Sequence, residues 1–393
     1  VHDFDTELTN NYAERHSLLF TSRALEPEWA DPVRPDGRRY SRQSFLLPLM
    51  LAPGYALAGK WGAMLTMAVM SAVVAWLTFA LACRYWNSGD GRGIVGAWAL
   101  LSLTPPLLLY SHQIWVEVPG ALLVLVALDR IHTPREATAS QTRNWTILGI
   151  ALLLLPLLKL RLVLLSVPLA LLAWWRGGGS RRGLVWVGVI AGGAVAGLLI
   201  FNQIVFGSPF KDHTLSQLLS IQSRAPLDYL RGLGGLFFDC AFGLVASNPL
   251  WLLLAPAMVV LVGRRPPLLT DLAILTVPYL AVVTPRLEWF GAWSPPFRFG
   301  LVLLPLLALL LVPLLRNRLS GARQGLMIAL AVLAAGLSLL WVVVPGWTYN
   351  LAVGTNHLVD HLAIRWSADV ARFLPSMVRV RTATWLVPLV VSG

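Results

Sequence analysis

The sequence predicts an all-α membrane protein, a polytopic transmembrane helical bundle of about ten spans with an interfacial helix and outer loops. Of 393 residues, 56% are hydrophobic and only 13% are charged, which a water-soluble domain of this length could not solvate. Several apolar runs approach or exceed the ~20 residues that cross a ~30 Å hydrocarbon core as a helix. The arginines gather in short turns between these runs.

The first apolar stretch, SFLLPLMLAPGYALAG (44–59), is short and contains two prolines, so we expect it to lie along the outer interface. The predicted spans that follow it are 61–83, 94–110, 114–129, 145–158, 162–175, 183–206, 243–262, 268–284, 297–315 and 325–345. This gives an outer loop with the interfacial helix at 1–60, a transmembrane bundle at 61–345 and an outer segment at 346–393. The chain opens on a polar stretch without a signal peptide, and we expect it to be cut at its amino end.

Five connections are short and rich in arginine, and the positive-inside rule places them at the cytoplasmic face. They are 84–92, 130–143, 176–182, 264–265 and 316–323. The remaining connections and both ends of the chain then face outward. The number of times that the run 145–175 crosses the membrane fixes the side on which every later turn lies. Only a hairpin there keeps all five arginine-rich turns on one side. Each arm of that hairpin spans only ~22 Å at 1.5 Å per residue.

Ionisable residues at membrane depth and at span mouths are expected to gather on the outer side. Glu117 is the sharpest case, since a charged group in a membrane span is costly and its retention points to function. The alternative is that Glu117 pairs with Lys159 or Arg161 and only holds helices together. Lys159 and Arg161 cap the hairpin, where they could bind an anionic headgroup or simply snorkel.

Other candidates lie at the outer turns. Arg298 begins a span beside an aromatic stretch, where it could grip a phosphate by paired hydrogen bonds or serve as an interface anchor. His112 could carry a proton, although a solvated loop histidine is the commoner case. Gln113 stands beside it at the turn before Glu117. Asp239 ends the long outer connection and could act in the site or cap the next helix.

Five stretches, taken in order, resemble the GT-C class of polyprenyl-phosphate-dependent glycosyltransferases, in the branch of the protein mannosyltransferases and aminoarabinose transferases. They are HDFDTELTNNYAER, SFLLPLMLAPGYALAG, YSHQIWVEVPGALLVLVAL, LFFDCAFGLVASNPLWLLLAPA and WFGAWSPPFRFGLVLLPLLALL. The likeness runs from residue 1 to about residue 315. In this branch an acidic pair that would lie upstream of Val1 supplies the catalytic carboxylate, and Cys240 and Ala241 stand where polar residues are usual.

The resemblance implies transfer of a sugar from a polyprenyl-phosphate donor to a glycan, lipid or protein acceptor at the outer face of the plasma membrane. We take Glu117 and Asp5 as candidate catalytic acids, Arg298, Arg161 and Lys159 as ligands of the donor phosphate, and His112, Gln113 and Asp239 as accessory residues. A divalent cation is left open as a cofactor.

A transporter or flippase of lipid-linked sugar is the alternative function, since it would also need cations and a buried acid. We see no inverted repeat of the kind that many transporters carry, which favours the transferase modestly. Nucleic acid is not an expected partner, because the basic residues are spread over separate turns and membrane orientation explains them. Membrane lipids are the other expected partners.

Overall fold

The structure is a computed structural model, which describes residues 37–38, 40, 44–86, 88–133, 138–176, 181–209, 226–264, 266–286, 288–291, 294–316, 321–348, 350, 354, 356–366 and 374–378. Within these residues every secondary-structure element is a helix, so the predicted all-α class is confirmed. The chain divides into two compact units, unit 1 with residues 1–69 and 114–220 and unit 2 with residues 70–113 and 221–393.

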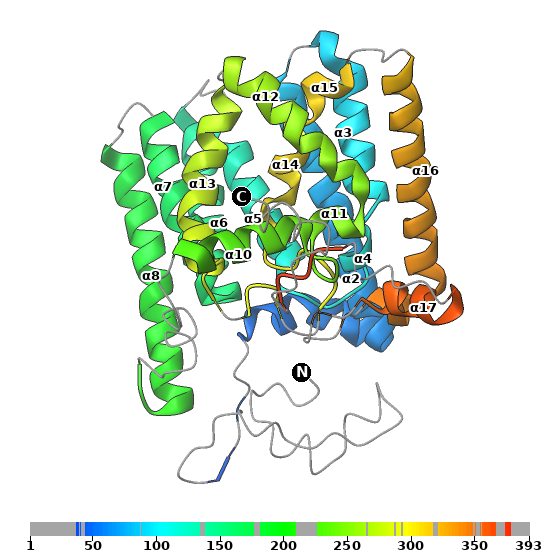
Figure 1. Cartoon of the computed structure of the whole chain (residues 1–393). Helices are drawn as coiled ribbons and strands as arrows, with labels where there is room; N and C mark the ends of the chain where they lie inside the picture. Colours follow the sequence, from blue (N-terminus) through cyan, green and yellow to red (C-terminus); the bar gives the residue numbers. More distant parts are fainter. Residues whose placement is uncertain are drawn as a thin grey trace. The chain divides into compact units, whose positions relative to one another are not determined.

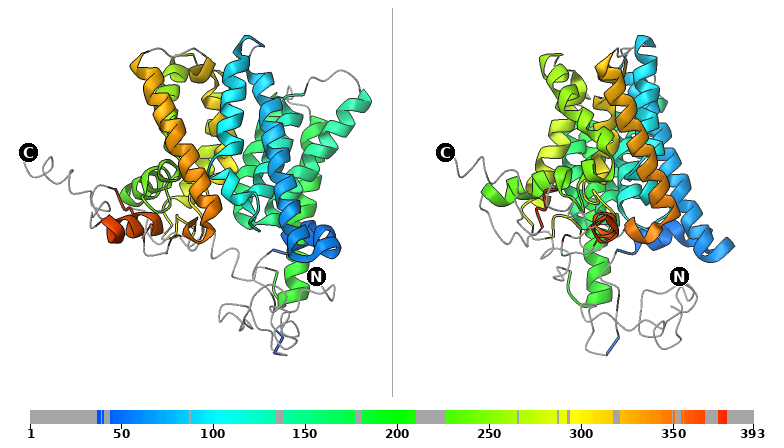
Figure 2. Two further views of the ribbon diagram at one scale, coloured as in Figure 1. Left: turned by 90° about the vertical axis from the view of Figure 1, so that its right-hand side faces the viewer. Right: turned by 45° about the vertical axis from the view of Figure 1, so that its right-hand side comes forward.

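The long helix α2 (Leu46–Tyr85) is interrupted where the sequence predicts the interfacial segment to end. Ala58 and Gly59 leave the helical region, and Gly59 has a φ of 55° and a ψ of −137°, a conformation that glycine adopts far more readily than other residues. Figure 2 shows the first part of α2 turning away from the rest of the helix. The division of 44–85 into a short helix and a longer one is therefore confirmed.

Unit 1 is built from the first part of α2 and four helices, α5 (Glu117–Ile131), α6 (Thr138–Leu158), α7 (Val163–Arg176) and α8 (Arg181–Phe206) (Figure 1). Helix α5 packs on α6 and α7, and α6 packs on α8. Between α6 and α7, Lys159 is extended and the 3-10 turn η3 (Leu160–Leu162) reverses the chain. Ser166 Oγ donates to the Leu152 carbonyl at 3.1 Å, so the two helices form the predicted hairpin.

The first arm of this hairpin is longer than predicted. Helix α6 begins at Thr138 rather than at residue 145 and has 21 residues, which gives ~32 Å at 1.5 Å per residue. Its first turns are polar (TASQTRN), so a boundary drawn from hydropathy alone misses them. The second arm, α7, has 14 residues and stays short.

The turns of unit 1 sort into two ends. At one end Arg130 Nη1 donates to Asn144 Oδ1 at 3.3 Å, and the Trp145 ring packs against Gly183. At the other end Ser44 donates to the Leu157 carbonyl, next to the hairpin turn. The two arginine-rich connections 130–143 and 176–182 therefore share one end of unit 1, as the predicted hairpin requires.

Unit 2 holds the rest of α2 and the remaining helices (Figure 1). These are η2 (Ser88–Asp90), α3 (Gly91–Leu103), α4 (Leu107–Tyr110), α10 (Pro226–Phe238), α11 (Leu244–Ser247), η4 (Pro249–Leu253), α12 (Leu254–Arg264), α13 (Pro267–Val283), η5 (Leu301–Leu303), α14 (Leu304–Leu310), α15 (Val312–Arg316), α16 (Ala322–Val343), η6 (Pro345–Thr348) and α17 (His357–Trp366). Three predicted spans, 94–110, 243–262 and 297–315, are thus broken into shorter pieces.

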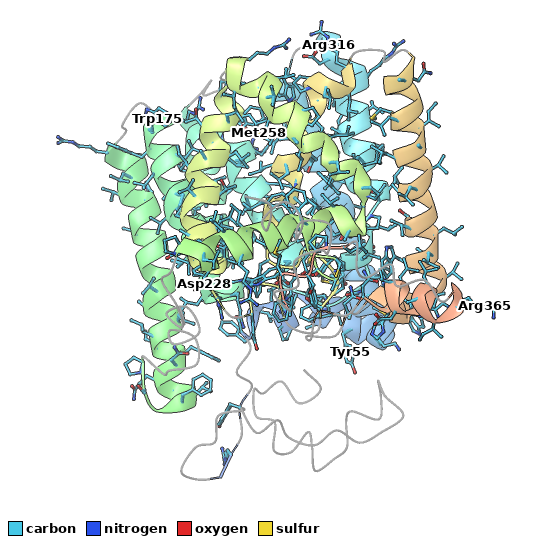
Figure 3. All side chains as sticks on the ribbon, in the orientation of Figure 1. Tyr55, Trp175, Asp228, Met258, Arg316 and Arg365 are labelled. Atoms are coloured by element: carbon cyan, nitrogen blue, oxygen red, sulfur yellow. The ribbon has the colours of Figure 1, made fainter. Side chains whose placement is uncertain are left out.

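The ends of unit 2 sort in the same way. Arg316 pairs with Asp90 at 2.8 Å, and Tyr85 Oη donates to Asp271 Oδ2 at 2.7 Å, so turns that follow α2, precede α13 and follow α15 share one end. At the other end Tyr110 Oη donates to the Pro295 carbonyl at 2.7 Å. Figure 3 shows Arg316 and Arg365 at opposite ends of this unit.

Glycines bring α3 against α15. Gly93 and Gly96 face the backbone of Val312 and the side chain of Leu315, and a Cβ on Gly93 would collide with the Val312 carbonyl. Together with Gly91 they have the G-x-G-x-x-G spacing of dinucleotide-binding turns. That spacing follows the 3-10 turn η2 rather than a strand, so helix packing accounts for it.

Two described helices, Leu46–Tyr85 and Gln324–Val343, are long and apolar enough to cross a membrane. The bent pair Pro249–Arg264 and Pro267–Val283, with an angle of 118° between its parts, adds a third if it counts as one span. These helices are consistent with a membrane protein. The ten-span count and the assignment of either end to the cytosol stay predictions.

Candidate functional site

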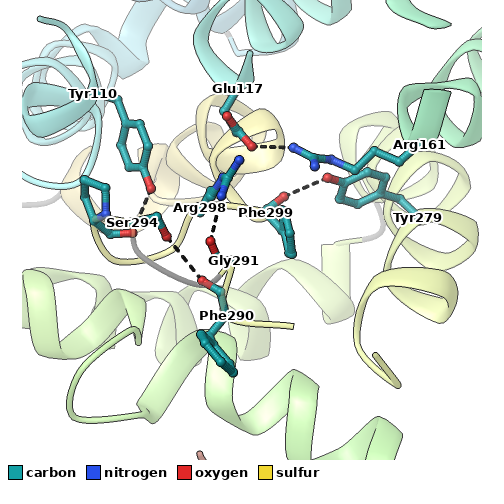
Figure 4. Close-up of polar contacts among 10 residues, drawn as sticks. Tyr110, Glu117, Arg161, Tyr279, Phe290, Gly291, Ser294, Arg298 and Phe299 are labelled. Carbon is teal, nitrogen blue, oxygen red and sulfur yellow. Dashed lines mark hydrogen bonds and ion pairs between the residues drawn. The ribbon is translucent and has the colours of Figure 1, made fainter. Parts of the chain in front are cut away.

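The predicted acid Glu117 forms an ion pair in unit 1. It is the first residue of α5 and is fully buried, with 0% of its side chain exposed. Arg161 in the hairpin turn donates through Nη2 to Glu117 Oε1, as Figure 4 shows. Arg161 is itself 7% exposed. The helix-holding alternative for Glu117 is therefore present in the structure, with Arg161 as its partner.

The hairpin break is what brings Arg161 to Glu117. Because Lys159 is extended, the next three residues form a tight turn that packs on α6 and α7, and both of those helices pack on α5. A carboxylate in the first turn of a helix also interacts favourably with the helix dipole. The local chain geometry thus places a cation and an anion at the same end of unit 1. Lys159, two residues before Arg161 in the chain, is half-buried.

Arg298 lies in unit 2, in the irregular segment between α13 and η5. Its guanidinium Nη1 donates to the Gly291 carbonyl at 2.6 Å, and its Cζ lies 5.5 Å from the centre of the Phe299 ring. Gly291 has a φ of +89°, and a Cβ there would lie 2.6 Å from Arg298 Cδ. The side chain is half-buried, and the Gly291 carbonyl and the Phe299 ring fix its position.

The backbone next to Arg298 is strained. Phe297 has a φ of +61°, a left-handed conformation that is uncommon for an aromatic residue. It is held there by its N–H, which donates to the Phe242 carbonyl at 2.8 Å, and by edge contact with Phe237 at a ring separation of 5.8 Å. Strain of this kind persists only where the surroundings impose it, and it is common at functional sites.

Two tyrosines hold the flanks of the same segment. Tyr279 on α13 donates its hydroxyl to the Phe299 carbonyl at 3.0 Å, and Tyr110 on α4 donates to the Pro295 carbonyl (Figure 4). Both tyrosines are fully buried. The segment 294–300 is therefore built into the core of unit 2 rather than left as a surface loop.

Asp239 is fully buried and is bound by backbone N–H groups. Its Oδ1 accepts from Ala241 and Phe242 at 2.9 and 3.0 Å, and its Oδ2 accepts from Met377 and Val378 at 2.6 and 3.4 Å. Burial raises the pKa of Asp239 above its ordinary value of 3.8, and the four N–H donors oppose that shift. The predicted capping of the next helix is wrong, because the N-cap of α11 is Gly243 and no side chain caps that helix. Asp239 instead closes the turn before α11 and binds the C-terminal region, a link that the sequence does not reveal.

The other candidates fall in different places. His112 is exposed in the turn after α4, and Gln113 next to it is buried. Asp5 lies outside the described residues, so its catalytic role stays a prediction. Among the described residues no group of three or more His, Cys, Asp or Glu side chains is placed to hold a metal ion. A divalent cation also stays a prediction.

Three buried acids lie outside the predicted site residues. Asp129 pairs with Arg130, Asp90 pairs with Arg316, and Asp271 accepts from Tyr85. All three lie at the unit ends that hold the arginine-rich turns, so buried acids are not confined to the predicted outer end. Asp271 could have been predicted from the sequence, because it is a carboxylate inside the apolar run 268–284.

Comparison of the chain with protein-family models, with curated proteins and with solved structures finds no match. The likeness to the GT-C class therefore rests on the five sequence stretches alone.

Proposed function

We propose that the chain is a membrane glycosyltransferase that moves a sugar from a polyprenyl-phosphate donor to an acceptor at the outer face of the plasma membrane. The observation that carries the proposal is Arg298, a half-buried guanidinium fixed by the Gly291 carbonyl and the Phe299 ring beside a strained backbone. Arginine presents a planar fork of donors that matches a phosphate group.

The proposed chemistry is departure of a polyprenyl phosphate from the sugar. Negative charge develops on the phosphate as the bond breaks, and donors that are already in place stabilise that charge at little reorganisation cost. Arg298 is the principal candidate for this role. Arg161 and Lys159 are the further cations proposed to bind the donor phosphate.

Glu117 fits a positioning role better than that of the base. Its charge is balanced by Arg161, and the pair holds the guanidinium in a defined place. A general base that deprotonates the acceptor hydroxyl would contribute about 10²- to 10⁴-fold. In this proposal Asp5 supplies that base.

A transporter or flippase of lipid-linked sugar is the second candidate. It is favoured by the interrupted helices of unit 2, where α11, η4 and α12, and likewise η5, α14 and α15, replace single long spans. Transporters often bind their substrate at such breaks. The buried Glu117–Arg161 pair suits either function.

A direct assay separates the two functions. The full-length protein in lipid nanodiscs is incubated with polyprenyl-phosphate sugars, and cleavage of the donor is followed. We expect cleavage, and we expect Arg298→Ala to reduce it by about 10²-fold or more, because charge stabilisation in the transition state is lost. Arg316→Ala is the matched control, since this half-exposed arginine pairs with Asp90 at the other end of unit 2.

The same protein in vesicles serves for the second function. Movement of intact lipid-linked sugar without cleavage supports the transporter and contradicts the transferase. Equal loss of cleavage in Arg298→Ala and Arg316→Ala would contradict the role proposed for Arg298.

A further inference from the structure

We infer that Asp239 is a positioning residue that links the C-terminal segment 375–378 to Arg298 through the turn 239–242. The inference rests on the proposed function, because it assigns Arg298 the donor phosphate. All of the residues involved belong to unit 2.

The segment 375–378 is held by its main chain. Asp239 accepts from the N–H groups of Met377 and Val378, while Arg231 donates to the carbonyls of the same two residues at 2.6 and 2.8 Å. The Cys240 N–H donates to the Pro375 carbonyl at 2.8 Å. Asp239 and Arg231 therefore clamp the dipeptide 377–378 between them, through its N–H and its carbonyl groups. This dipeptide begins 138 residues after Asp239 in the chain.

The turn 239–242 is held from two further places in the C-terminal region. Asn356 Nδ2 donates to the Cys240 carbonyl at 2.6 Å, and Asn350 Nδ2 donates to the Ala241 carbonyl. Asp239 itself closes the turn through the Ala241 and Phe242 N–H groups. The conformation of the turn thus depends on residues beyond 345.

The same turn reaches the strained residue. The Phe242 carbonyl accepts from the Phe297 N–H at 2.8 Å, and the Phe242 ring packs on Phe290 at 4.8 Å. Phe290 and Phe297 lie on either side of the loop that fixes Arg298, one before Gly291 and the other directly before Arg298. A shift of the turn would release the left-handed Phe297 and move the guanidinium.

The test is a mutant cycle on binding of a polyprenyl phosphate without sugar to the full-length protein in nanodiscs. We expect Arg298→Ala to weaken binding about tenfold or more and Asp239→Asn to weaken it about fivefold, since Asn places an N–H₂ group among four N–H donors. If Asp239 acts through Arg298, the double variant binds no worse than Arg298→Ala. A general loss of folding would instead make the two losses add.

Arg231→Met provides a second route, because it loosens the clamp while Asp239 and its turn keep their atoms. We expect a loss of about threefold that again disappears in the Arg298→Ala background. Asp228→Asn is the matched control on α10 and should bind as the unaltered chain does. Additive losses, or unchanged binding in both Asp239→Asn and Arg231→Met, overturn the inference. Unchanged binding in Arg298→Ala overturns the proposed function itself.

Discussion

Two fully buried carboxylates, one in each unit, are stabilised in opposite ways. Glu117 in unit 1 is paired with the Arg161 guanidinium, so its charge is balanced by another charge. Asp239 in unit 2 forms no ion pair within the described residues and is bound by four backbone N–H groups. The first acid joins helices through side chains, whereas the second joins distant stretches of main chain.

This difference determines what each acid can do. A buried ion pair contributes little net stability but is costly to break from one side, so Glu117 and Arg161 act as a unit. Backbone donors have fixed positions, so Asp239 fixes the path of the chain around it. We therefore propose that Glu117 positions a cation and that Asp239 positions the Arg298 loop.

The largest effect is expected when one partner of the Glu117–Arg161 ion pair is removed. Glu117→Leu leaves the Arg161 guanidinium buried without its carboxylate, and we expect a loss of about 3–5 kcal/mol in the free energy of unfolding. The double variant Glu117→Leu/Arg161→Met should recover most of that loss, because two apolar side chains can fill the space. Denaturant unfolding in detergent measures both. A double variant as unstable as the single one would show that charge balance is not what Glu117 supplies.

Removal of the other acid should cost somewhat less. Asp239→Ala leaves four backbone N–H groups, two of them buried and two half-buried, without their acceptor, and we expect a loss of about 2–4 kcal/mol. Asp228→Ala, at a half-buried position in the helix α10 that precedes Asp239, should change stability by no more than about 0.5 kcal/mol. Limited proteolysis adds a local measurement, since the region after residue 345 should be cut faster in Asp239→Ala alone. Equal behaviour of the two variants would contradict the clamp.

A smaller effect is expected at the glycine that contacts Arg298. Gly291→Ala introduces a Cβ at a φ of +89° and 2.6 Å from Arg298 Cδ, and we expect a loss of about 1–2 kcal/mol. Binding of polyprenyl phosphate should weaken as well, because the guanidinium must move. Gly188→Ala, where α8 offers open space, is the control. A variant that binds normally would separate Arg298 from the proposed phosphate site.

The smallest effect concerns pH. Because burial raises the pKa of Asp239 in the folded chain, the protonated form is favoured by folding. The contribution of Asp239 to the free energy of unfolding is fully present below its ordinary pKa. It is lost as the pH rises through the raised pKa of the folded chain. The difference in unfolding free energy between the unaltered chain and Asp239→Asn should therefore shrink with rising pH over that window. A difference that grows with pH would mean that the N–H donors outweigh burial.

Local signals in the sequence predict much of the helical framework. The prolines and length of 44–59 predict a separate helix before the span at 61–83, and the break falls at Ala58 and Gly59. The sidedness of the five arginine-rich turns predicts the hairpin in 145–175, and the chain reverses at η3. The first feature depends on residues that are neighbours in the chain, whereas the second depends on the pattern of charge along the whole chain.

The site itself depends on contacts that leave no local pattern. The clamp on 375–378 binds main-chain groups of that segment, so no side-chain type at those positions predicts it. The breaks within 243–262 and 297–315 do have a local signal, since Asn248 and Pro249 begin η4 and Pro305 stands in the first turn of α14. The path of the chain around them is set by long-range hydrogen bonds such as Phe297 to Phe242, which the sequence does not reveal. Asp271 could have been found from the sequence, since an acid within an apolar run is visible without a structure.

Sidedness is the central claim, because one sugar-transfer centre requires the ends that carry Glu117 and Arg298 to face the same side of the membrane. The direct measurement is labelling of single cysteines by a membrane-impermeant maleimide in intact cells, after replacement of Cys83 and Cys240 by alanine. Exposed positions are available for both ends, His112 and Glu288 for the proposed outer end and Arg143 and Arg264 for the arginine-rich turns. We predict that cysteines at 112 and 288 are labelled from outside and that those at 143 and 264 are labelled only after permeabilisation. Labelling of 112 and 288 from opposite sides would contradict the account.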